Sequence, residues 1–113
     1  PIERFEVVYF HRTHRCSGCL RAEDLIRRTV AGTYAGRIQN GDLVLLVENY
    51  EDPEDPALVE RYGAGWSALY FGVAKADVFY IYPVESIWLA GGDDAKFGEI
   101  LRGEIDSVYG GDV

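Results

Sequence analysis

The chain has 113 residues, a formal net charge of −8 at pH 7 and a hydrophobic content of 48%. This length predicts a single domain over residues 1–113, with a flexible C-terminal tail from about residue 108. The acidic charge excludes nucleic acid as an expected partner, because its phosphates would be repelled. No apolar stretch reaches the length of a membrane-spanning helix, so we expect a soluble chain with no membrane span.

The start of the chain leaves the compartment open. It begins at Pro1 and contains no methionine, which indicates either a removed initiator methionine or a missing upstream segment. No stretch has the charged and then apolar form of a targeting sequence. Localisation is therefore unknown: the cytoplasm is the first expectation, and export is expected instead if an upstream signal segment was removed.

The first half of the chain predicts a strand, a helix and a second strand. Residues 5–10 form a β-branched and aromatic run that is typical of a buried strand. Apolar residues at helical spacing predict a helix over 17–34 that ends near Gly36. The apolar run at 42–49 predicts a central strand.

The second half predicts a short helix, a hairpin and a last helix. Pro56 at the start and Gly63 past the end are typical of the limits of a short helix. Residues 67–74 and 77–83 predict two strands joined by a tight turn at Lys75-Ala76. Asp93 or Asp94 caps the last predicted helix, whose apolar stripe comprises Phe97, Ile100, Leu101 and Ile105.

The resulting order, β-α-β-α-β-β-α, predicts an α/β fold. A strand–helix–strand start implies two parallel strands with a right-handed crossover. The hairpin then adds two antiparallel strands, which gives a four-stranded mixed sheet. Helices are expected to flank both faces of this sheet.

The stretch "HRTHRCSGC", residues 11–19, contains both cysteines and both histidines of the chain. Two residues between cysteines at a helix start place both sulfurs on one side of the first turn. Free backbone N–H groups and the helix dipole favour an anion there, and such surroundings lower the pKa of a thiol from about 8.5 to roughly 3.5–7.5. Nearby basic side chains would add to this effect: His11, Arg12, His14 and Arg15.

A strand followed by Cys-x-x-Cys at the head of a helix, within a β-α-β unit, resembles the thioredoxin-like superfamily. The stretch "EDPALVERYGAGWSAL" (54–69) is similar to the thioredoxin segment that leads from an acidic loop through a helix into the third strand. The resemblance covers about residues 5–105 and leaves no room for thioredoxin's additional N-terminal strand and helix. It implies a thioredoxin-like fold and a redox-active dithiol.

The chain also departs from thioredoxin in its motifs. Where thioredoxin has a cis-proline before the third strand, residues 66–68 read Trp-Ser-Ala. Thioredoxin has a buried acid in the first strand at the place matched by Phe10, and a tryptophan at the place matched by Arg15. The dipeptide between the cysteines is Ser17-Gly18 in place of Gly-Pro.

The resemblance implies a thiol–disulfide oxidoreductase that acts on protein or small-molecule disulfides. Cys16 would attack the substrate disulfide and Cys19 would resolve the mixed disulfide. Trp66 and Ser67 would shape the substrate groove. The expected partners are a disulfide or dithiol and an electron donor or acceptor protein, and no organic cofactor is implied because the dithiol carries two electrons. The tuning residues would be His14, Arg15, His11 and Arg12.

Two alternatives remain open for this scaffold. The first is metal handling, because the four side chains form H-x2-H-x-C-x2-C, a mixed nitrogen and sulfur set suited to zinc or copper. All four come from one segment, whereas structural zinc sites usually draw ligands from two. The second alternative is a non-catalytic interaction domain. The candidate metal ligands are His11, His14, Cys16 and Cys19.

Overall fold

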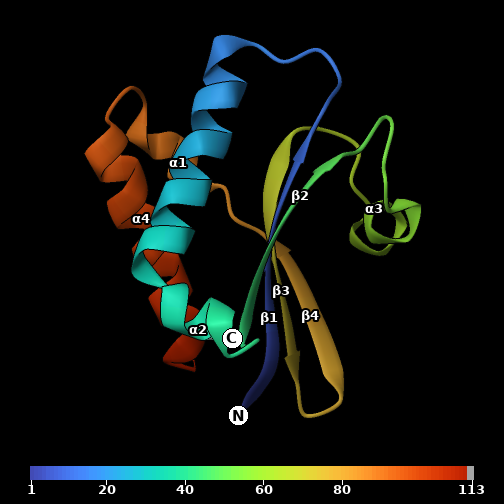
Figure 1. Ribbon diagram of the computed structural model, residues 1–113, viewed down its shortest axis with the longest axis vertical. Coiled ribbons are helices and arrows are strands. Elements are labelled where there is room, and N and C mark those ends of the chain that lie inside the picture. The colour runs from blue at the N-terminus through green and yellow to red at the C-terminus, as the bar shows by residue number, and fades with distance from the viewer. Residues whose placement is uncertain (112–113) are drawn as a thin grey trace.

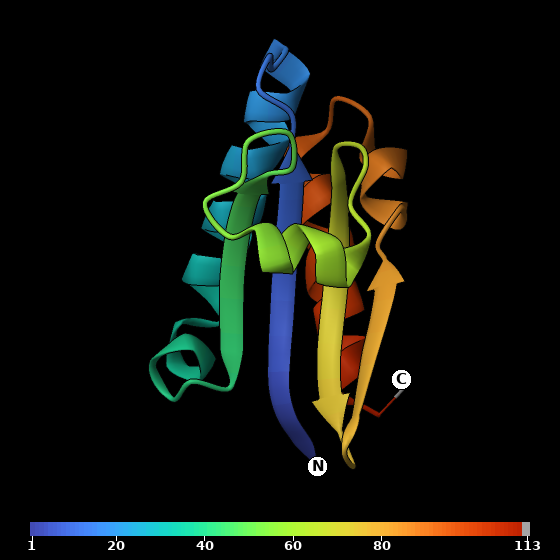
Figure 2. The ribbon, with the colours of Figure 1, turned by 90° about the vertical axis from the view of Figure 1, so that its right-hand side faces the viewer.

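The computed structural model describes residues 1–111, which form three layers around a central sheet (Figure 1). Helices α1 (Ser17–Thr33), α2 (Ala35–Gln39) and α4 (Asp94–Tyr109) lie on one side of the sheet. Helix α3 (Pro56–Tyr62) crosses the opposite face, in front of the strands in Figure 2. The expectation that helices flank both faces is confirmed.

The sheet has four strands in the order β2-β1-β3-β4. Strand β1 (Ile2–His11) is parallel to β2 (Leu43–Asn49) and antiparallel to β3 (Ala68–Lys75), which pairs with β4 (Val78–Pro83). The predicted mixed sheet and its parallel β-α-β crossover are therefore confirmed. A short 3-10 helix, η1 (Ser86–Ala90), follows β4 and has no counterpart among the predicted elements.

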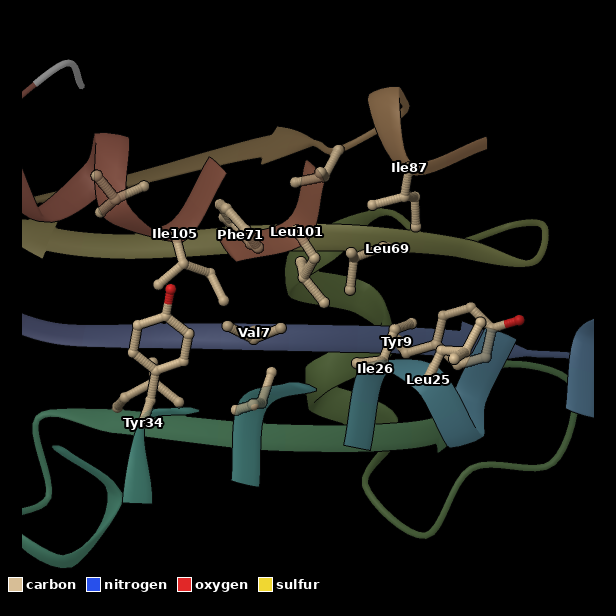
Figure 3. Packing of buried hydrophobic residues seen from close by; sticks show 14 of the residues in the cluster. Val7, Tyr9, Leu25, Ile26, Tyr34, Leu69, Phe71, Ile87, Leu101 and Ile105 are labelled. Carbon is tan, nitrogen blue, oxygen red and sulfur yellow. The ribbon is translucent and has the colours of Figure 1, made fainter. Parts of the chain in front are cut away.

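The side chains of β1 alternate between two hydrophobic clusters. Val7 and Tyr9 point toward α1 and α4 and belong to the larger cluster, whose packing is shown in Figure 3. Val8 and Phe10 point toward α3 and belong to the smaller cluster. Helices cover both faces of β1 over residues 5–10, so the apolar residues in that stretch have no solvent exposure. This burial explains why the sequence there is almost continuously apolar.

The hairpin turn lies one residue later than predicted. Strand β3 continues through Lys75, and the turn consists of Ala76 and Asp77, with φ angles of 51° and 64°. Two successive positive φ angles match the twist of the flanking strands. Neither residue is glycine, so the turn lacks the usual sequence signal.

Two further boundaries differ from the prediction. Helix α1 ends at Thr33, and Gly36 lies inside the separate helix α2 instead of ending the first helix. At the C-terminus, Val108 is buried in α4 and the helix continues to Tyr109, so the chain is helical just past residue 108, where the flexible tail was expected to begin. The remainder of the expected tail, residues 112–113, lies outside the described residues.

Other predicted limits are confirmed. Pro56 begins α3 and Gly63 ends it in the left-handed conformation, as predicted, and the carboxylate of Asp55 caps the helix, which was not predicted. Asp93, one of the two predicted caps, accepts a hydrogen bond from the backbone N–H of Lys96 at the start of α4. No helix within residues 1–111 is both long enough and apolar enough to span a bilayer.

Candidate functional site

The two cysteines lie where the loop after β1 enters α1, at the top of the molecule in Figure 1. Cys16 has an extended backbone, with φ −85° and ψ 169°, and is the N-cap of the helix. Its sulfur accepts a hydrogen bond from the backbone N–H of Cys19 at 3.4 Å. The sulfur thus takes the position in which serine or aspartate oxygens usually cap a helix.

The two sulfur atoms lie 3.1 Å apart, and both cysteines are free thiols. This separation is about 1 Å longer than a disulfide bond, so a small movement would join the sulfurs. Cys16 is exposed and Cys19 is partly buried. The hydrogen bond from the Cys19 thiol, followed by the backbone N–H of Cys19, lowers the pKa of Cys16 below its ordinary value. Such an exposed thiol with a lowered pKa is chemically suited to nucleophilic attack.

His11 is held between two neighbours at the end of β1. Its Nε2 lies 2.5 Å from the Arg15 guanidinium and its Nδ1 lies 2.9 Å from the carbonyl oxygen of Arg12. Because arginine only donates, Nε2 accepts and Nδ1 carries the proton, which assigns a neutral imidazole. In this arrangement His11 does not add the positive charge that the sequence led us to expect near the sulfurs.

Arg15 and its neighbours are paired with carboxylates. Arg15 forms an ion pair with Glu23 of α1, and Glu23 also accepts a hydrogen bond from Arg27 at 2.8 Å. Burial alone would raise the pKa of Glu23, but Arg27 and Arg15 hold it below its ordinary value. Arg21 forms an ion pair with Asp94 at the start of α4. Of the four basic residues that the sequence placed beside the cysteines, Arg15 is therefore the one whose charge is paired with a carboxylate among residues 1–111.

His14 and Arg12 are exposed in the loop that precedes the cysteines. Within residues 1–111, no group of three or more His, Cys, Asp or Glu side chains is gathered closely enough to hold a metal ion. The alternative ligand set of His11, His14, Cys16 and Cys19 is therefore not assembled in this arrangement. Among these four residues, the sulfur atoms of Cys16 and Cys19 are the one pair of candidate ligand atoms that lie within hydrogen-bond distance of each other in residues 1–111.

Trp66 and Ser67 precede β3 at the same end of the sheet as the dithiol, since Phe10 of β1 pairs with Ala68. Together with Glu85 and Trp88, they line a groove of about 460 Å³. The two tryptophan side chains are 64% and 46% exposed. Neither cysteine is among the lining residues, and no cis peptide bond occurs within residues 1–111.

Tyr9 lies on the α1 side of β1, and the sequence did not single it out. The residue matched to thioredoxin's buried acid, Phe10, points instead toward α3. Tyr9 is fully buried, and its hydroxyl is a buried polar atom without a hydrogen-bond partner among residues 1–111. The alternation of side chains along the strand is the signal that would have identified it, once the phase of that strand was known.

Comparison with known proteins identifies the fold. No protein-family model matches the chain, and no curated protein does. Among solved structures, the chain is similar to the solution structure of a thioredoxin from Thermus thermophilus, with 20% sequence identity and a TM-score of 0.51. The match covers 92% of this chain and 75% of that one. Together with the strand order and the helices on both faces, this similarity shows that the chain has a thioredoxin-like fold.

Proposed function

We propose that this protein is a thiol–disulfide oxidoreductase that uses Cys16 and Cys19 on protein or small-molecule disulfides. The observation that carries the proposal is the pair of free thiols 3.1 Å apart at the N-terminus of α1. A thioredoxin-like fold fits a redox role for such a pair.

Each cysteine has a different part in the proposed reaction. The exposed Cys16 thiolate attacks one sulfur of a substrate disulfide, so that a mixed disulfide forms and the other substrate sulfur leaves as a thiolate. The Cys19 thiolate then attacks the Cys16 sulfur, which forms the Cys16–Cys19 disulfide and releases the second substrate thiolate. Two electrons pass to the substrate, and the reverse sequence oxidises a dithiol.

The groove beside Trp66 and Ser67 supports a substrate that has an extended, partly apolar segment. Exposed tryptophan rings offer large contact areas, and Glu85 adds one negative charge to the groove. An electron donor or acceptor protein would also have to approach Cys16, which is open to solvent. His14, Arg15, His11 and Arg12 remain the proposed tuning residues, although the ion pair of Arg15 and the hydrogen bonds of His11 predict a smaller electrostatic effect than the number of basic residues suggests.

Turnover of a protein disulfide with dithiothreitol as the electron donor tests the proposal. Wild type is compared with Cys16→Ser, Cys19→Ser and the double variant, which contains no thiol because the chain has two cysteines. We expect turnover to be lost in Cys16→Ser, and Cys19→Ser to accumulate a mixed disulfide. Turnover that survives in the double variant contradicts the assignment.

Metal content measured on the same samples addresses the alternatives. Stoichiometric zinc or copper bound by wild type, without turnover, would favour the metal-handling function. Neither turnover nor metal would favour a non-catalytic interaction domain on the same scaffold. A Trp66→Ala variant that turns over a small disulfide normally, but a protein disulfide more slowly, would support the groove as the substrate surface.

A further expectation concerns the redox potential. The lowered pKa of Cys16 indicates that the thiolate of the reduced form is stabilised, and the dipeptide between the cysteines lacks proline. Both features favour the dithiol, so the protein should be more oxidising than thioredoxin. Equilibration with mixtures of reduced and oxidised glutathione measures this potential, and a value at or below that of thioredoxin contradicts the expectation.

A further inference from the structure

The hydroxyl group of Tyr9 is buried and has no hydrogen-bond partner among residues 1–111. The Tyr9 side chain has no solvent exposure. A buried hydroxyl without a partner destabilises a fold, because it has lost its hydrogen bonds to water and gained none. Phenylalanine would fill the same volume without this cost, so the surroundings of the hydroxyl decide whether it has a function.

The hydroxyl points toward the dithiol end of the molecule. The ring of Tyr9 packs among the residues of the larger cluster, beside Leu25 and Ile26 of α1 (Figure 3). Its oxygen points toward the carboxyl end of β1, which is the end where α1 begins (Figure 3). The hydroxyl is therefore directed toward the end of the sheet at which α1 and its cysteine pair begin.

The charged and titratable groups around the Tyr9 hydroxyl belong to this same site. Burial raises the pKa of Tyr9 to about 12, and the neighbouring groups that affect it are, in decreasing order, Cys19, Arg15, Glu23 and Cys16. The phenol therefore keeps its proton throughout the neutral range and is available there as a hydrogen-bond donor. Among these neighbours Arg15 and Glu23 already pair with each other, and the Cys16 sulfur already accepts a hydrogen bond from the backbone N–H of Cys19. The Cys19 sulfur is the neighbour for which residues 1–111 provide no such donor.

We propose that the Tyr9 hydroxyl is held unpartnered so that it donates a hydrogen bond to the thiolate of Cys19. This inference rests on the proposed dithiol chemistry and assigns a residue to one step of it. When an external thiolate attacks Cys16 of the disulfide, a bond forms to Cys16, the bond between the two cysteines breaks, and its electron pair moves to the Cys19 sulfur. That sulfur becomes an anion in a partly buried place, and the hydroxyl stabilises it without giving up its own proton.

The same contact acts in the opposite direction of the reaction. A Cys19 sulfur that ionises more easily provides a larger fraction of the nucleophile that resolves the mixed disulfide. Hydrogen bonds to a charged acceptor are about twice as strong as those between neutral groups, so the contact strengthens when the thiol becomes a thiolate. Tyr9 is thus a positioning residue that favours one ionisation state of Cys19.

The test is a Tyr9→Phe substitution in the Cys16→Ser background, where Cys19 is the remaining thiol. Ultraviolet absorbance follows the formation of the Cys19 thiolate as the pH is raised. We expect the pH midpoint of this transition to rise by about one unit in Tyr9→Phe, which is a roughly tenfold smaller thiolate fraction at neutral pH. This readout needs no turnover, so the inference is tested even if the proposed oxidoreductase activity is absent.

Tyr109→Phe is the matched control. Tyr109 also has a buried hydroxyl without a hydrogen-bond partner among residues 1–111, but it packs against Phe5 and Arg37. Phe5 pairs with Leu43 at the start of β2, so this contact lies at the end of the sheet opposite the dithiol. Both substitutions remove an unpartnered hydroxyl and should leave thermal stability equal or higher. Only Tyr9→Phe should move the ionisation of Cys19. An unchanged midpoint in Tyr9→Phe, or an equal shift in both variants, overturns the inference.

Turnover separates the inference from the proposed function. In the chain with both cysteines, Tyr9→Phe should slow the resolution of the Cys16 mixed disulfide and make the reduction potential more negative, since the Cys19 thiolate of the reduced form is less stabilised. If Tyr9→Phe shifts the midpoint of Cys19 ionisation but wild type turns over no disulfide, the oxidoreductase function alone is rejected. Normal turnover with no effect of Tyr9→Phe on midpoint or potential rejects the inference alone.

Discussion

The carboxylate of Glu6 is the most informative site for a test of what stabilises the fold. Glu6 lies on the α3 side of β1 and is 4% exposed. It accepts hydrogen bonds from the Tyr62 hydroxyl at 2.7 Å, from Arg61 at 3.0 Å and from Arg4 at 2.8 Å. These contacts connect α3 to the middle of the sheet. We expect Glu6→Gln, which keeps the size of the side chain and removes its charge, to destabilise the protein.

The magnitude follows from the exposure of the three partners. Arg4 and Arg61 are about half exposed, with side-chain values of 48% and 47%, so each ion pair is screened and contributes less than about 1 kcal/mol. The bond from the buried Tyr62 hydroxyl to a charged acceptor is worth about 1.5–3 kcal/mol, against about 1 kcal/mol for a neutral acceptor. The sum predicts a decrease of about 2 kcal/mol in the free energy of unfolding, or roughly 5–10 °C in Tm.

Urea unfolding of wild type and Glu6→Gln measures this difference, and Glu3→Gln is the control because Glu3 is exposed on the same strand. Burial alone would raise the pKa of Glu6, but hydrogen bonds from Arg4 and Tyr62 and the charge of Arg61 lower it below 4.5. A lowered pKa in the folded state gives stability that is present above about pH 4.5 and is lost as the pH falls further. The two proteins should therefore converge in acid. A difference below about 0.5 kcal/mol at neutral pH, or one that persists unchanged in acid, refutes this reasoning.

Three other substitutions test separate features. A Cβ at Gly72 would meet the Tyr62 hydroxyl and lie 2.6 Å from the ring of Phe79, so Gly72→Ala should lower the free energy of unfolding by about 1–3 kcal/mol in urea titrations. Ala76 has a φ of 51°, a conformation that asparagine tolerates better than alanine. Ala76→Asn should therefore raise the free energy of unfolding by about 0.5–1 kcal/mol, which thermal unfolding would show as a higher Tm. The Cys19 thiol is the first cause of the lowered pKa of Cys16, so Cys19→Ala should shift the alkylation of Cys16 by iodoacetamide to higher pH, as followed by mass spectrometry.

Much of the fold was predictable because single segments carry its signals. The cap, proline and left-handed glycine of α3 are local, and they set its limits at Pro56 and Tyr62. The elements that escaped prediction are short or depend on the neighbouring structure. Helix α2 has five residues and buries none of them, so it has no apolar stripe. The turn at Ala76 and Asp77 follows from the pairing of β3 with β4, and the sequence there contains none of the glycine dipeptides that usually mark such a turn.

The candidate site was predictable in its sulfur atoms and less so in its charges. The spacing of Cys16 and Cys19 at a helix start is enough to bring their sulfurs together. The basic residues around them suggested a positive field, but Arg15 meets Glu23 eight residues later on α1 and also holds His11. Such pairing depends on how the loop folds back on the helix. The charge around a site therefore cannot be counted from sequence neighbours alone.

The two faces of β1 carry side chains with different roles: one face contributes to the stability of the fold, and the other contributes to the proposed chemistry of the dithiol. Glu6 points toward α3, and Tyr9 points toward α1 and the dithiol; three residues of an extended strand also place them about 10 Å apart. Substitution of Glu6 should therefore lower stability and leave the ionisation of Cys19 unchanged at temperatures below unfolding. Substitution of Tyr9 by phenylalanine should shift the ionisation of Cys19 and leave stability equal or higher, because its hydroxyl has no hydrogen-bond partner to lose among residues 1–111. If both variants changed both properties, β1 would transmit strain between its faces, and neither side chain would have the separate role assigned to it.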